Sequence, residues 1–409
     1  MTLLSVIGSG YGDEGKGLAV DAITAHHLRH GEVTVVRVNG GAQAGHTVQT
    51  PDGNRHVFHQ FGAGSLAGAR THWASRFVTS PMFFSSEKAD LNALGARTDA
   101  ITADPRVMIT TPWDIMINQA IEQKRGNTRH GSCGMGFGET IERNENGFKI
   151  TLADIGKADF RDNLNFIRTS WFPRRMEQLG LDPDEFSRLA LDDGIMNRFI
   201  ADATDMLGKI EIVDDLYMRA DRFGQIITEG AQGLALDMDI GDFPHVTRSN
   251  TGMKNVADFA REAGFYHVHA TYMTRAYATR HGAGPFPEEE DIREWIDFND
   301  PTNAPNAWQG AIRTGVLDGD GLISRIQRDE EISDVSDIKF TRSIGVSCLD
   351  QIIGPPKLIM RGQTVEVEHI PYELCQEYGF DLDIRSVGPS RDSVLYSGSN
   401  FLENRIPSP

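Results

Sequence analysis

Short apolar runs that end in glycine recur along the chain. Residues 3–7 read LLSVI before a glycine, and residues 33–38 read VTVVRV before the glycine-rich stretch NGGAQAGHT. Between them, LAVDAITAHHL (18–28) has the apolar spacing of a helix, so the chain begins with a strand, a glycine loop and a helix. Strands that end in glycine-rich loops indicate a parallel α/β sheet, in which ligands bind beyond the carboxyl ends of the strands. Further strands of this sheet are predicted at 106–110, 224–230, 266–272 and 343–350.

Two parts of the chain depart from this alternation. Residues 155–222 are rich in Leu, Met, Arg and Asp with few β-branched clusters, which favours helices and predicts an inserted helical subdomain. The C-terminal third, with IGPPKLIM and QTVEVEHI, is predicted to be a small region of short strands. The expected fold class is therefore α/β, with a large, mostly parallel central sheet flanked by helices, the helical insertion and the C-terminal strands.

Composition and charge narrow the range of partners. The chain has 409 residues, of which 39% are hydrophobic and 24% charged, as is usual for a soluble enzyme-sized domain. Its formal net charge of -18 at pH 7 would repel nucleic-acid phosphates, whose binding depends largely on Lys and Arg. We therefore expect neither DNA nor RNA as a partner.

Cysteine usage and the N-terminus indicate a cytoplasmic protein. The three cysteines, Cys133, Cys348 and Cys375, are widely spaced and odd in number, which supports neither a disulfide framework nor a zinc site. The N-terminus lacks a basic segment with a cleavage site, and no run of about 18 apolar residues occurs. Secretion and membrane insertion are not expected.

The first glycine loop almost matches a phosphate-binding loop. Gly10 to Lys16 fit the spacing G-x-x-x-x-G-K, but Gly17 stands where a P-loop NTPase places the Ser or Thr that holds Mg²⁺. Backbone N–H groups of such a loop bind an anion, and Lys16 adds a positive charge. The loop could be only a tight strand-to-helix turn, but the acidic Asp13 and Glu14 within it indicate a cation or a proton transfer. Asp13 is therefore our candidate both for contacting Mg²⁺ and for accepting a substrate proton.

Six ordered motifs resemble those of the adenylosuccinate synthetases, which join aspartate to C6 of a purine 5′-monophosphate. GSGYGDEGKG resembles the family's GxxxGDEGKG, NGGAQAGHT its GGNNAGHT, and TEGAQGLALDMDIGDFPHVTRSNT its EGAQGxxLDIDxGxYPYVTSSNT. Later, RAYATRHGAGPFPEE resembles KAYxTRVGxGPFPTE, RTGVLD resembles RTGWLD, and IRSVGPSRD resembles IISxGPDR. The resemblance covers most of the chain and implies a single domain over 1–409.

The resemblance implies roles for particular residues. Asp13 would remove the proton from purine N1, and His46 would act as the acid that stabilises the phosphoryl group passing from the NTP to O6, with Lys16 neutralising charge. Asp13 and the carbonyl of Gly45 would bind Mg²⁺. The implied NTP-binding residues are Gly12, Glu14, Gly15, Lys16, Gly17, Gly45, His46, Thr47, Asp350, Gly388 and Pro389. Those implied for the purine monophosphate are Ser9, Asp13, Gln43, Ser132, Cys133, Arg143, Gln232 and Thr247, and those for L-aspartate are Arg313 and Thr314.

Three of these positions carry open questions. Gln232 could read the purine's six-position or only cap a turn. Cys133 stands where the family has threonine and is a poorer hydrogen-bond donor, so backbone N–H groups could take over its phosphate contact. The family also uses an arginine from the neighbouring subunit on this phosphate, for which Arg143 is the nearest candidate, and this implies a homodimer.

Departures from the family motifs bear on the substrate. NAWQGAIRTGVLD retains only Arg313 of an arginine cluster that holds the aspartate carboxylates and touches the ribose, so a deoxynucleotide becomes a candidate. Gly10 replaces a larger residue and either makes room for a 2-amino substituent or relaxes the turn. Together these departures resemble the viral branch of the family, which acts on dGMP to supply 2-aminoadenine DNA synthesis. Such a protein would work in the host cytoplasm.

The donor nucleotide depends on the alignment register. The family's TKLD pairs with SCLD (347–350), which keeps the carboxylate of Asp350, or with TRSI (341–344), which loses it. The viral resemblance favours ATP or dATP, whereas a retained Asp350 permits GTP. The leading hypothesis is a ligase that uses dGMP, and its nearest rival is the ordinary reaction with IMP and GTP. A P-loop-like nucleotide switch predicts Ser or Thr at position 17 and is contradicted by Gly17. A catalytically silent relative is disfavoured by the joint presence of Asp13, Lys16, His46 and Gln232.

Overall fold

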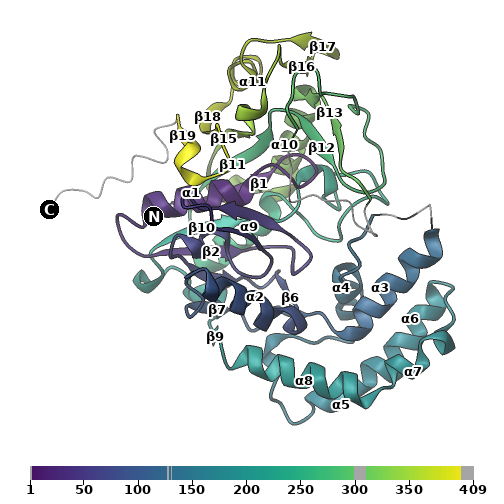
Figure 1. Ribbon diagram of the computed structural model, residues 1–409. Helices are drawn as coiled ribbons and strands as arrows, with labels where there is room; N and C mark the ends of the chain where they lie inside the picture. Colours follow the sequence, from purple (N-terminus) through teal and green to yellow (C-terminus); the bar gives the residue numbers. More distant parts are fainter. Residues whose placement is uncertain (1, 127–128, 130, 299–309, 398–409) are drawn as a thin grey trace.

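A parallel sheet with helices on both faces forms the centre of the molecule. The computed structural model describes residues 2–126, 129, 131–298 and 310–397 (Figure 1). In this described part, ten strands form one sheet in the order β19-β18-β15-β11-β1-β10-β2-β5-β7-β9. Its neighbouring strands run parallel except β18 and β19, which are antiparallel. The predicted large, mostly parallel sheet is therefore confirmed. The strands are β1 (Leu3–Gly8), β2 (Val33–Arg37), β5 (Arg70–Trp73), β7 (Ile101–Ala103), β9 (Glu211–Ile212), β10 (Gln225–Glu229), β11 (His267–Arg275), β15 (Lys339–Ser347), β18 (Asp381–Ser386) and β19 (Val394–Tyr396).

The central strands form because their side chains are apolar on both faces. Every residue of β1 and β2 is buried, as expected for inner strands of a parallel sheet covered on both sides. Along β1, Leu4 and Val6 belong to one core cluster and Leu3 and Ile7 to the other, so successive side chains point to opposite faces. Helix α1 (Lys16–His27) packs on the first face, whereas α9 (Met253–Ala263) and α10 (Gly319–Ser333) contribute to the second core.

The predicted strands agree with the structure at five of six places. The ranges 3–7, 33–38, 224–230, 266–272 and 343–350 correspond to β1, β2, β10, β11 and β15. β15 ends at Ser347 because Cys348 adopts the left-handed conformation (φ 60°). The prediction for 106–110 was wrong for the central sheet. There only Met108–Ile109 form a strand, β8, which pairs with β6 (Val78–Thr79) in a separate two-stranded sheet because β7 already occupies this edge of the main sheet.

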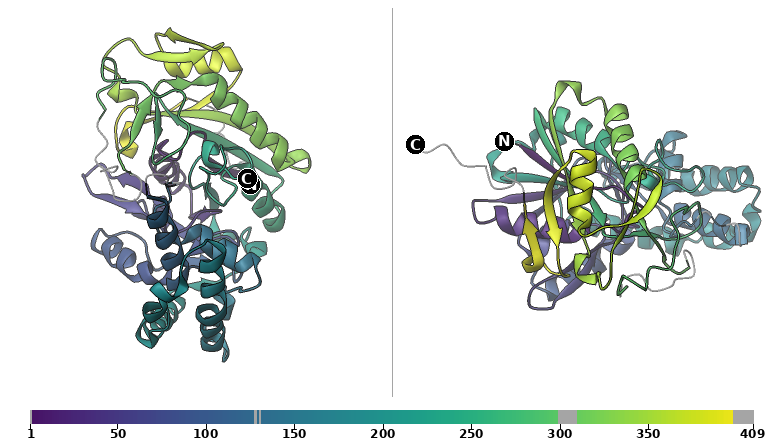
Figure 2. Two further views of the ribbon diagram at one scale, coloured as in Figure 1. Left: turned by 90° about the vertical axis from the view of Figure 1, so that its right-hand side faces the viewer. Right: turned by 90° about the horizontal axis from the view of Figure 1, so that it is seen from above.

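Several helices gather beyond the β7–β9 edge of the sheet, in blue and teal in Figures 1 and 2. They are α3 (Pro112–Arg125), α4 (Phe137–Glu145), α5 (Phe160–Phe166), α6 (Phe172–Gln178), α7 (Ser187–Ala190) and α8 (Asp193–Leu207). The range 155–222 contains α5 to α8, but α6 packs against α3 and α8 against α2 (Pro81–Ala93), both earlier in the chain. The same range also supplies β9 to the sheet. The limits of a helical subdomain at 155–222 stay a prediction.

The C-terminal strands divide between two sheets. β14 (Leu317–Asp318), β16 (Lys357–Met360) and β17 (Gln363–Glu366) form a small sheet, while β18 and β19 extend the central one beyond α11 (Ile370–Tyr378). Two hairpin-like pairs lie near the carboxyl ends of the central strands and matter for the site: β3 (His46–Gln49) with β4 (Arg55–Phe58), and β12 (Ala278–Arg280) with β13 (Arg313–Gly315). In the described part of the chain, no helix has the length and apolar character needed to cross a bilayer.

Candidate active site

A cavity of about 570 Å³ opens beyond the carboxyl ends of the central strands. The loop after β1, the stretch after β2, the stretch after β10 and the end of β11 all contribute to its lining. Many residues expected to bind ligands line it together: Gly12, Asp13, Gly15, Lys16, Gly17, Gln43, Gly45, His46, Thr47, Ser132, Cys133, Gln232 and Thr247. Their convergence from distant parts of the sequence makes this cavity the candidate active site.

The opening loop explains why position 17 is glycine. Helix α1 begins at Lys16, directly after Gly15, which has φ 81° and no Cβ to strain. A Cβ at Gly17 would lie 2.8 Å from the backbone oxygen of Thr47 and 3.2 Å from Cβ of His46. The start of the helix therefore packs directly against β3, and a Ser or Thr at position 17 does not fit. Gly17 lets His46 and Thr47 approach the loop.

Glu14 lies behind the loop and is buried. Its Oε1 accepts hydrogen bonds from the backbone N–H groups of Gly10 (3.0 Å) and Gly12 (2.6 Å), and its Oε2 lies 2.6 Å from Nζ of Lys16. Lys16 also donates to the carbonyl of Gly12 (2.8 Å) and lines the cavity, which Glu14 does not. The structure therefore gives Glu14 the task of shaping the loop, and its expected contact with NTP stays a prediction.

The question of Gly10 turns on what surrounds it. A Cβ at Gly10 would lie 3.2 Å from Glu14 Oε1. Gly10 does not line the large cavity but a second one of about 20 Å³, which holds Glu288 and Arg325 on its other walls. The space left by its missing side chain therefore adjoins Glu14.

Asp13 is held from two sides at the tip of the loop. Nε of Arg275, at the end of β11, donates to its backbone carbonyl, and Nε2 of His281 lies 3.2 Å from its carboxylate Oδ2. Burial raises the pKa of Asp13, but the hydrogen bond with His281 and the charge of Arg275 outweigh this, so its pKa lies below the ordinary value. At neutral pH Asp13 is a carboxylate at the cavity wall, able to accept a proton or to bind a cation.

His46 lies at the opposite wall, on β3. Its Nδ1 is hydrogen-bonded to the carboxylate of Glu229 at the end of β10, and Arg37 lies 3.8 Å from the same carboxylate. Burial lowers the pKa of His46 to about 4, although Glu229 opposes this shift, so we assign a neutral imidazole that donates from Nδ1. Its Nε2 has no hydrogen-bond partner among the described residues. Glu229 thereby orients the ring and leaves Nε2 to a ligand in the cavity.

The wall formed by the 131–133 loop offers hydroxyl, thiol and backbone groups. Ser132 Oγ donates to Oδ1 of Asn118 at 3.0 Å and accepts from the backbone N–H of Gly134 at 3.2 Å. Burial raises the pKa of Cys133 to about 11, so its thiol stays protonated. Thr247 and Gln232 line the same cavity. This wall carries uncharged donors suited to an anionic oxygen.

Several predicted residues lie outside the cavity lining: Ser9, Glu14, Arg143, Arg313, Thr314, Asp350, Gly388 and Pro389. Ser9 is buried and donates to the carbonyl of Met273 at 2.7 Å. Asp350 is exposed in the turn after β15. Its segment nevertheless abuts the opening loop, because Ser347 Oγ donates to the backbone carbonyl of Glu14 at 3.0 Å.

The arginine retained from the aspartate-binding motif is already paired. Arg313 Nη2 lies 2.5 Å from Glu289 Oε2, its Nη1 donates to the carbonyl of Gly284 at 2.9 Å, and its guanidinium lies over the ring of Phe286. Residues 306–309 of the quoted motif lie outside the described residues. The expected contacts of Arg313 and Thr314 with aspartate stay predictions.

The prediction that Arg143 serves a neighbouring subunit was wrong. Arg143 is fully buried in its own chain, and its Nε lies 2.9 Å from Asp114 Oδ1. The other guanidinium nitrogens donate to the carbonyls of Phe148 (2.6 Å) and Ile109 (2.7 Å). A side chain enclosed and hydrogen-bonded in this way cannot reach across an interface, so Arg143 stabilises the packing of α4 on α3.

Sequence reasoning missed several charged and aromatic residues of the cavity: Tyr11, Arg175, Arg248, Arg275, Arg280 and His281. Arg275, Arg280 and His281 stand within RAYATRHGAGPFPEE, so the motif was a usable signal. The guanidinium of Arg280 lies 4.5 Å from the ring centre of Tyr11 and donates to the carbonyl of Pro285 at 2.7 Å. Arg175, on α6, ion-pairs with Glu139 at 2.7 Å, and nothing in its local sequence announces the cavity.

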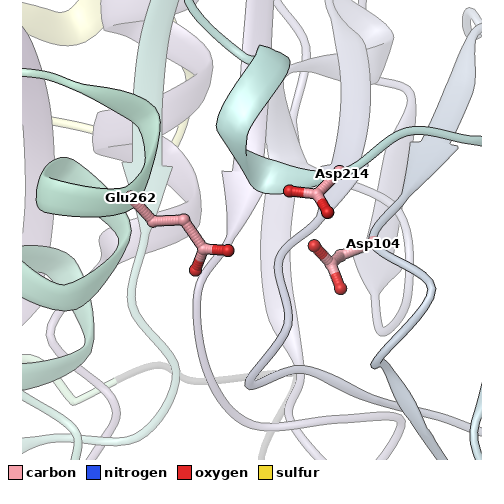
Figure 3. A group of neighbouring side chains, drawn as sticks. All are labelled: Asp104, Asp214 and Glu262. Atoms are coloured by element: carbon pink, nitrogen blue, oxygen red, sulfur yellow. The ribbon is translucent and has the colours of Figure 1, made fainter.

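A separate group of carboxylates lies away from this cavity. Figure 3 shows Asp104, Asp214 and Glu262, whose oxygens come within 4.8 Å of one another. Arg106 already provides positive charge there, because its Nη2 lies 2.6 Å from Asp104 Oδ2 and 2.5 Å from Glu262 Oε1. The cluster is an ion-pair network that joins the end of β7 to α9.

Comparison with known proteins gives the same family throughout. The family model described as adenylosuccinate synthetase matches residues 5–318. The chain is similar to the adenylosuccinate synthetase of Marinobacter nauticus, with 32% identity over 294 residues, and to that of Hahella chejuensis, with 28% identity over 364 residues. The first match covers 69% of this chain and spans 64% of the relative's length, and the second covers 85% and 78%.

Solved structures share the fold. The fully ligated adenylosuccinate synthetase of Plasmodium falciparum aligns with a TM-score of 0.73 at 18% identity, over 97% of this chain and 100% of that chain. The succinoaminodeoxyadenylate synthetase of cyanophage S-2L, bound to dGMP and to dATP as an energy donor, aligns with a TM-score of 0.61 at 14% identity, over 98% and 97%. Because the family model covers more than half of the sequence and the fold agrees, this chain belongs to the adenylosuccinate synthetase family.

Proposed function

We propose that this protein is a ligase of the adenylosuccinate synthetase type, which joins L-aspartate to C6 of a purine 5′-monophosphate at the expense of an NTP. The observation that carries the proposal is the convergence of Asp13, Lys16, His46 and Gln232 on one cavity in a chain of this family. A nucleotide switch of the P-loop kind is disfavoured, because the backbone of Thr47 leaves no room for a hydroxyl side chain at position 17.

The cavity residues would act in two steps. Asp13 takes the proton from purine N1, and the electron pair makes O6 nucleophilic towards the γ-phosphorus of the NTP. NDP leaves, and a 6-phosphoryl purine remains. The amine of aspartate then attacks C6, and phosphate departs with the former O6, so the products are the 6-succinylamino purine, NDP and phosphate.

His46 and Lys16 would neutralise the charge that moves during the first step. In the structure without nucleotide His46 is neutral, with Nε2 available to the cavity. An anionic phosphoryl group beside Nε2 favours the protonated ring, so the nucleotide raises the pKa of His46 on binding. Lys16 supplies a fixed positive charge at the same end.

The donor set fits Mg²⁺. The cation prefers oxygen ligands, and the carboxylate of Asp13 and the backbone of Gly45 both line the cavity. The lowered pKa of Asp13 keeps that carboxylate ionised at neutral pH. When bound, Mg²⁺ would neutralise phosphate charge, and Asp13 and the carbonyl of Gly45 would hold it.

Our preferred substrate is dGMP, with ATP or dATP as donor, giving a precursor of 2-aminoadenine DNA. Support comes from the reduced arginine cluster, since Arg313 is paired with Glu289, and from the fold shared with the cyanophage S-2L enzyme. IMP with GTP is the second candidate. It is favoured by the higher TM-score of the Plasmodium falciparum enzyme and by the position of the Asp350 turn beside the opening loop.

A substrate panel tests this proposal. Purified protein is incubated with aspartate, Mg²⁺ and each of ATP, dATP and GTP, together with dGMP, GMP or IMP, and the succinylated product is measured by mass spectrometry. Product from dGMP is expected. Turnover of IMP but not dGMP contradicts the substrate assignment, and release of phosphate without any succinylated product contradicts the ligase itself. Light scattering of the same sample tests the proposed homodimer.

A further inference from the structure

His281 offers Asp13 a contact that the family motif lacks. In RAYATRHGAGPFPEE it stands where the resembled motif KAYxTRVGxGPFPTE has valine, a side chain that cannot hydrogen-bond. Its Nε2 lies 3.2 Å from Oδ2 of Asp13, and both residues line the large cavity. The substitution therefore falls at the proposed general base.

The backbone that carries His281 is well anchored. His281 follows β12, whose Arg280 pairs in register with Arg313 of β13. Arg280 is buried, donates to the carbonyl of Pro285 at 2.7 Å and lies over Tyr11 of the opening loop. On the other side, the backbone of Gly282 closely approaches Gly131. A side chain on such a support has a fixed position relative to the opening loop.

Asp13 is thus fixed at both its main chain and its side chain. Arg275 holds its carbonyl, and His281 holds one carboxylate oxygen. General-base catalysis requires the carboxylate within hydrogen-bond reach of the proton it removes, and a misplacement of about 1 Å can cost about a hundredfold in rate. A carboxylate that was free to rotate would spend part of its time turned away from the purine.

We infer that His281 is a positioning residue, which binds Oδ2 of Asp13 and presents Oδ1 to N1–H of the purine monophosphate. This inference rests on the proposed function, because it presumes that Asp13 is the base. It further implies that the β12–β13 pair, which also carries Arg313 and Thr314, places the aspartate-binding strand and the base on one rigid support. His281 itself takes no part in bond making or breaking.

Three variants test the inference. H281V restores the motif residue, H281N keeps a side-chain N–H donor, and H30V makes the same His-to-Val change at an exposed position outside both cavities. We expect H281V to lower kcat by about tenfold to a hundredfold while KM for the monophosphate stays within about twofold. H281N should recover most of the loss, and H30V should match the parent protein.

Two measurements without turnover complete the test. The affinity for dGMP in the absence of NTP and Mg²⁺ should be unchanged in H281V. The downfield imidazole N–H resonance of the His281–Asp13 bond should appear in the parent protein and in H30V and be lost in both H281V and D13A. If H281V fails to fold, H281N and this resonance still decide the question.

The outcomes separate this inference from the proposed function. An unchanged kcat in H281V, or a loss of dGMP affinity that accounts for the whole effect, overturns the positioning role. Failure of the parent protein to convert any purine monophosphate refutes the proposed function instead. A resonance that survives in D13A shows that the bond to Asp13 is absent and also overturns the positioning role.

Discussion

Replacing Arg143 distinguishes a structural from a substrate-binding arginine. In R143A, Asp114 loses the guanidinium that lies 2.9 Å from its Oδ1, and the carbonyls of Ile109 and Phe148 lose their donors. Asp114 keeps its bonds from the backbone N–H and hydroxyl of Thr111, which cap α3. The carboxylate therefore stays partly satisfied, but it remains buried without a counter-charge.

The size of the effect follows from this burial. Removing one partner of a buried ion pair costs about 3–5 kcal/mol. Because Asp114 retains its capping bonds, we expect a loss near the lower end, about 3 kcal/mol. For a chain of 409 residues, with an unfolding entropy of about 2.1 cal/mol/K per residue, this corresponds to a fall in Tm of about 3–4 °C.

The assay combines unfolding with kinetics. Urea and thermal unfolding are followed by circular dichroism for the parent protein, R143A, R143M and R198A. Arg198 is 80% exposed and pairs with Asp202 within α8, so R198A should change stability by less than about 0.5 kcal/mol. An R143A protein as stable as the parent, with a raised KM for the purine monophosphate, would refute the structural role and restore the phosphate-binding one.

Three further predictions concern the loop, the α1 helix and the proposed acid. G17S places a Cβ 2.8 Å from the Thr47 carbonyl and should destabilise the protein by about 1–3 kcal/mol in urea unfolding; an unchanged midpoint contradicts the packing argument. Burial raises the pKa of Asp21 from 3.8 to about 7, so stability from its bound proton is full below pH 3.8 and lost as pH rises through 7. D21N should therefore match the parent near pH 4 and exceed it by up to about 4 kcal/mol at pH 8, and a lower stability at pH 8 contradicts the assignment. E229Q removes the anion that orients His46 and should lower kcat at least about tenfold with unchanged monophosphate affinity, as steady-state kinetics and calorimetry can show.

The parts of the fold that could be predicted are those fixed by local pattern. β1 and β2 are apolar throughout because both faces of the sheet are covered, and their glycine ends mark where the chain turns towards the site. The run at 106–110 has similar composition, yet it became a two-residue strand beside β6. Which strand a short apolar run pairs with depends on neighbours distant in sequence, and periodicity carries no information on that choice.

The candidate site shows the same division. The opening loop, His46 and Gln232 could be found because their motifs are contiguous and chemically unusual. The burial of Arg143 depends on Asp114, on a different helix, and the contact of His281 with Asp13 joins opposite ends of the fold. Such pairs arise from tertiary packing, so a motif alone placed Arg143 in the wrong environment and left His281 unnoticed.

Transfer of oxygen from the purine to phosphate tests the central claim most directly. The substrate is prepared with ¹⁸O at position 6 and incubated with the protein, aspartate, Mg²⁺ and unlabelled NTP, and the released phosphate is analysed by mass spectrometry. If the cavity phosphorylates O6 before aspartate attacks C6, each phosphate formed with the succinylated product carries one ¹⁸O. Succinylated product accompanied by unlabelled phosphate would contradict the 6-phosphoryl intermediate and the roles assigned to Asp13 and His46.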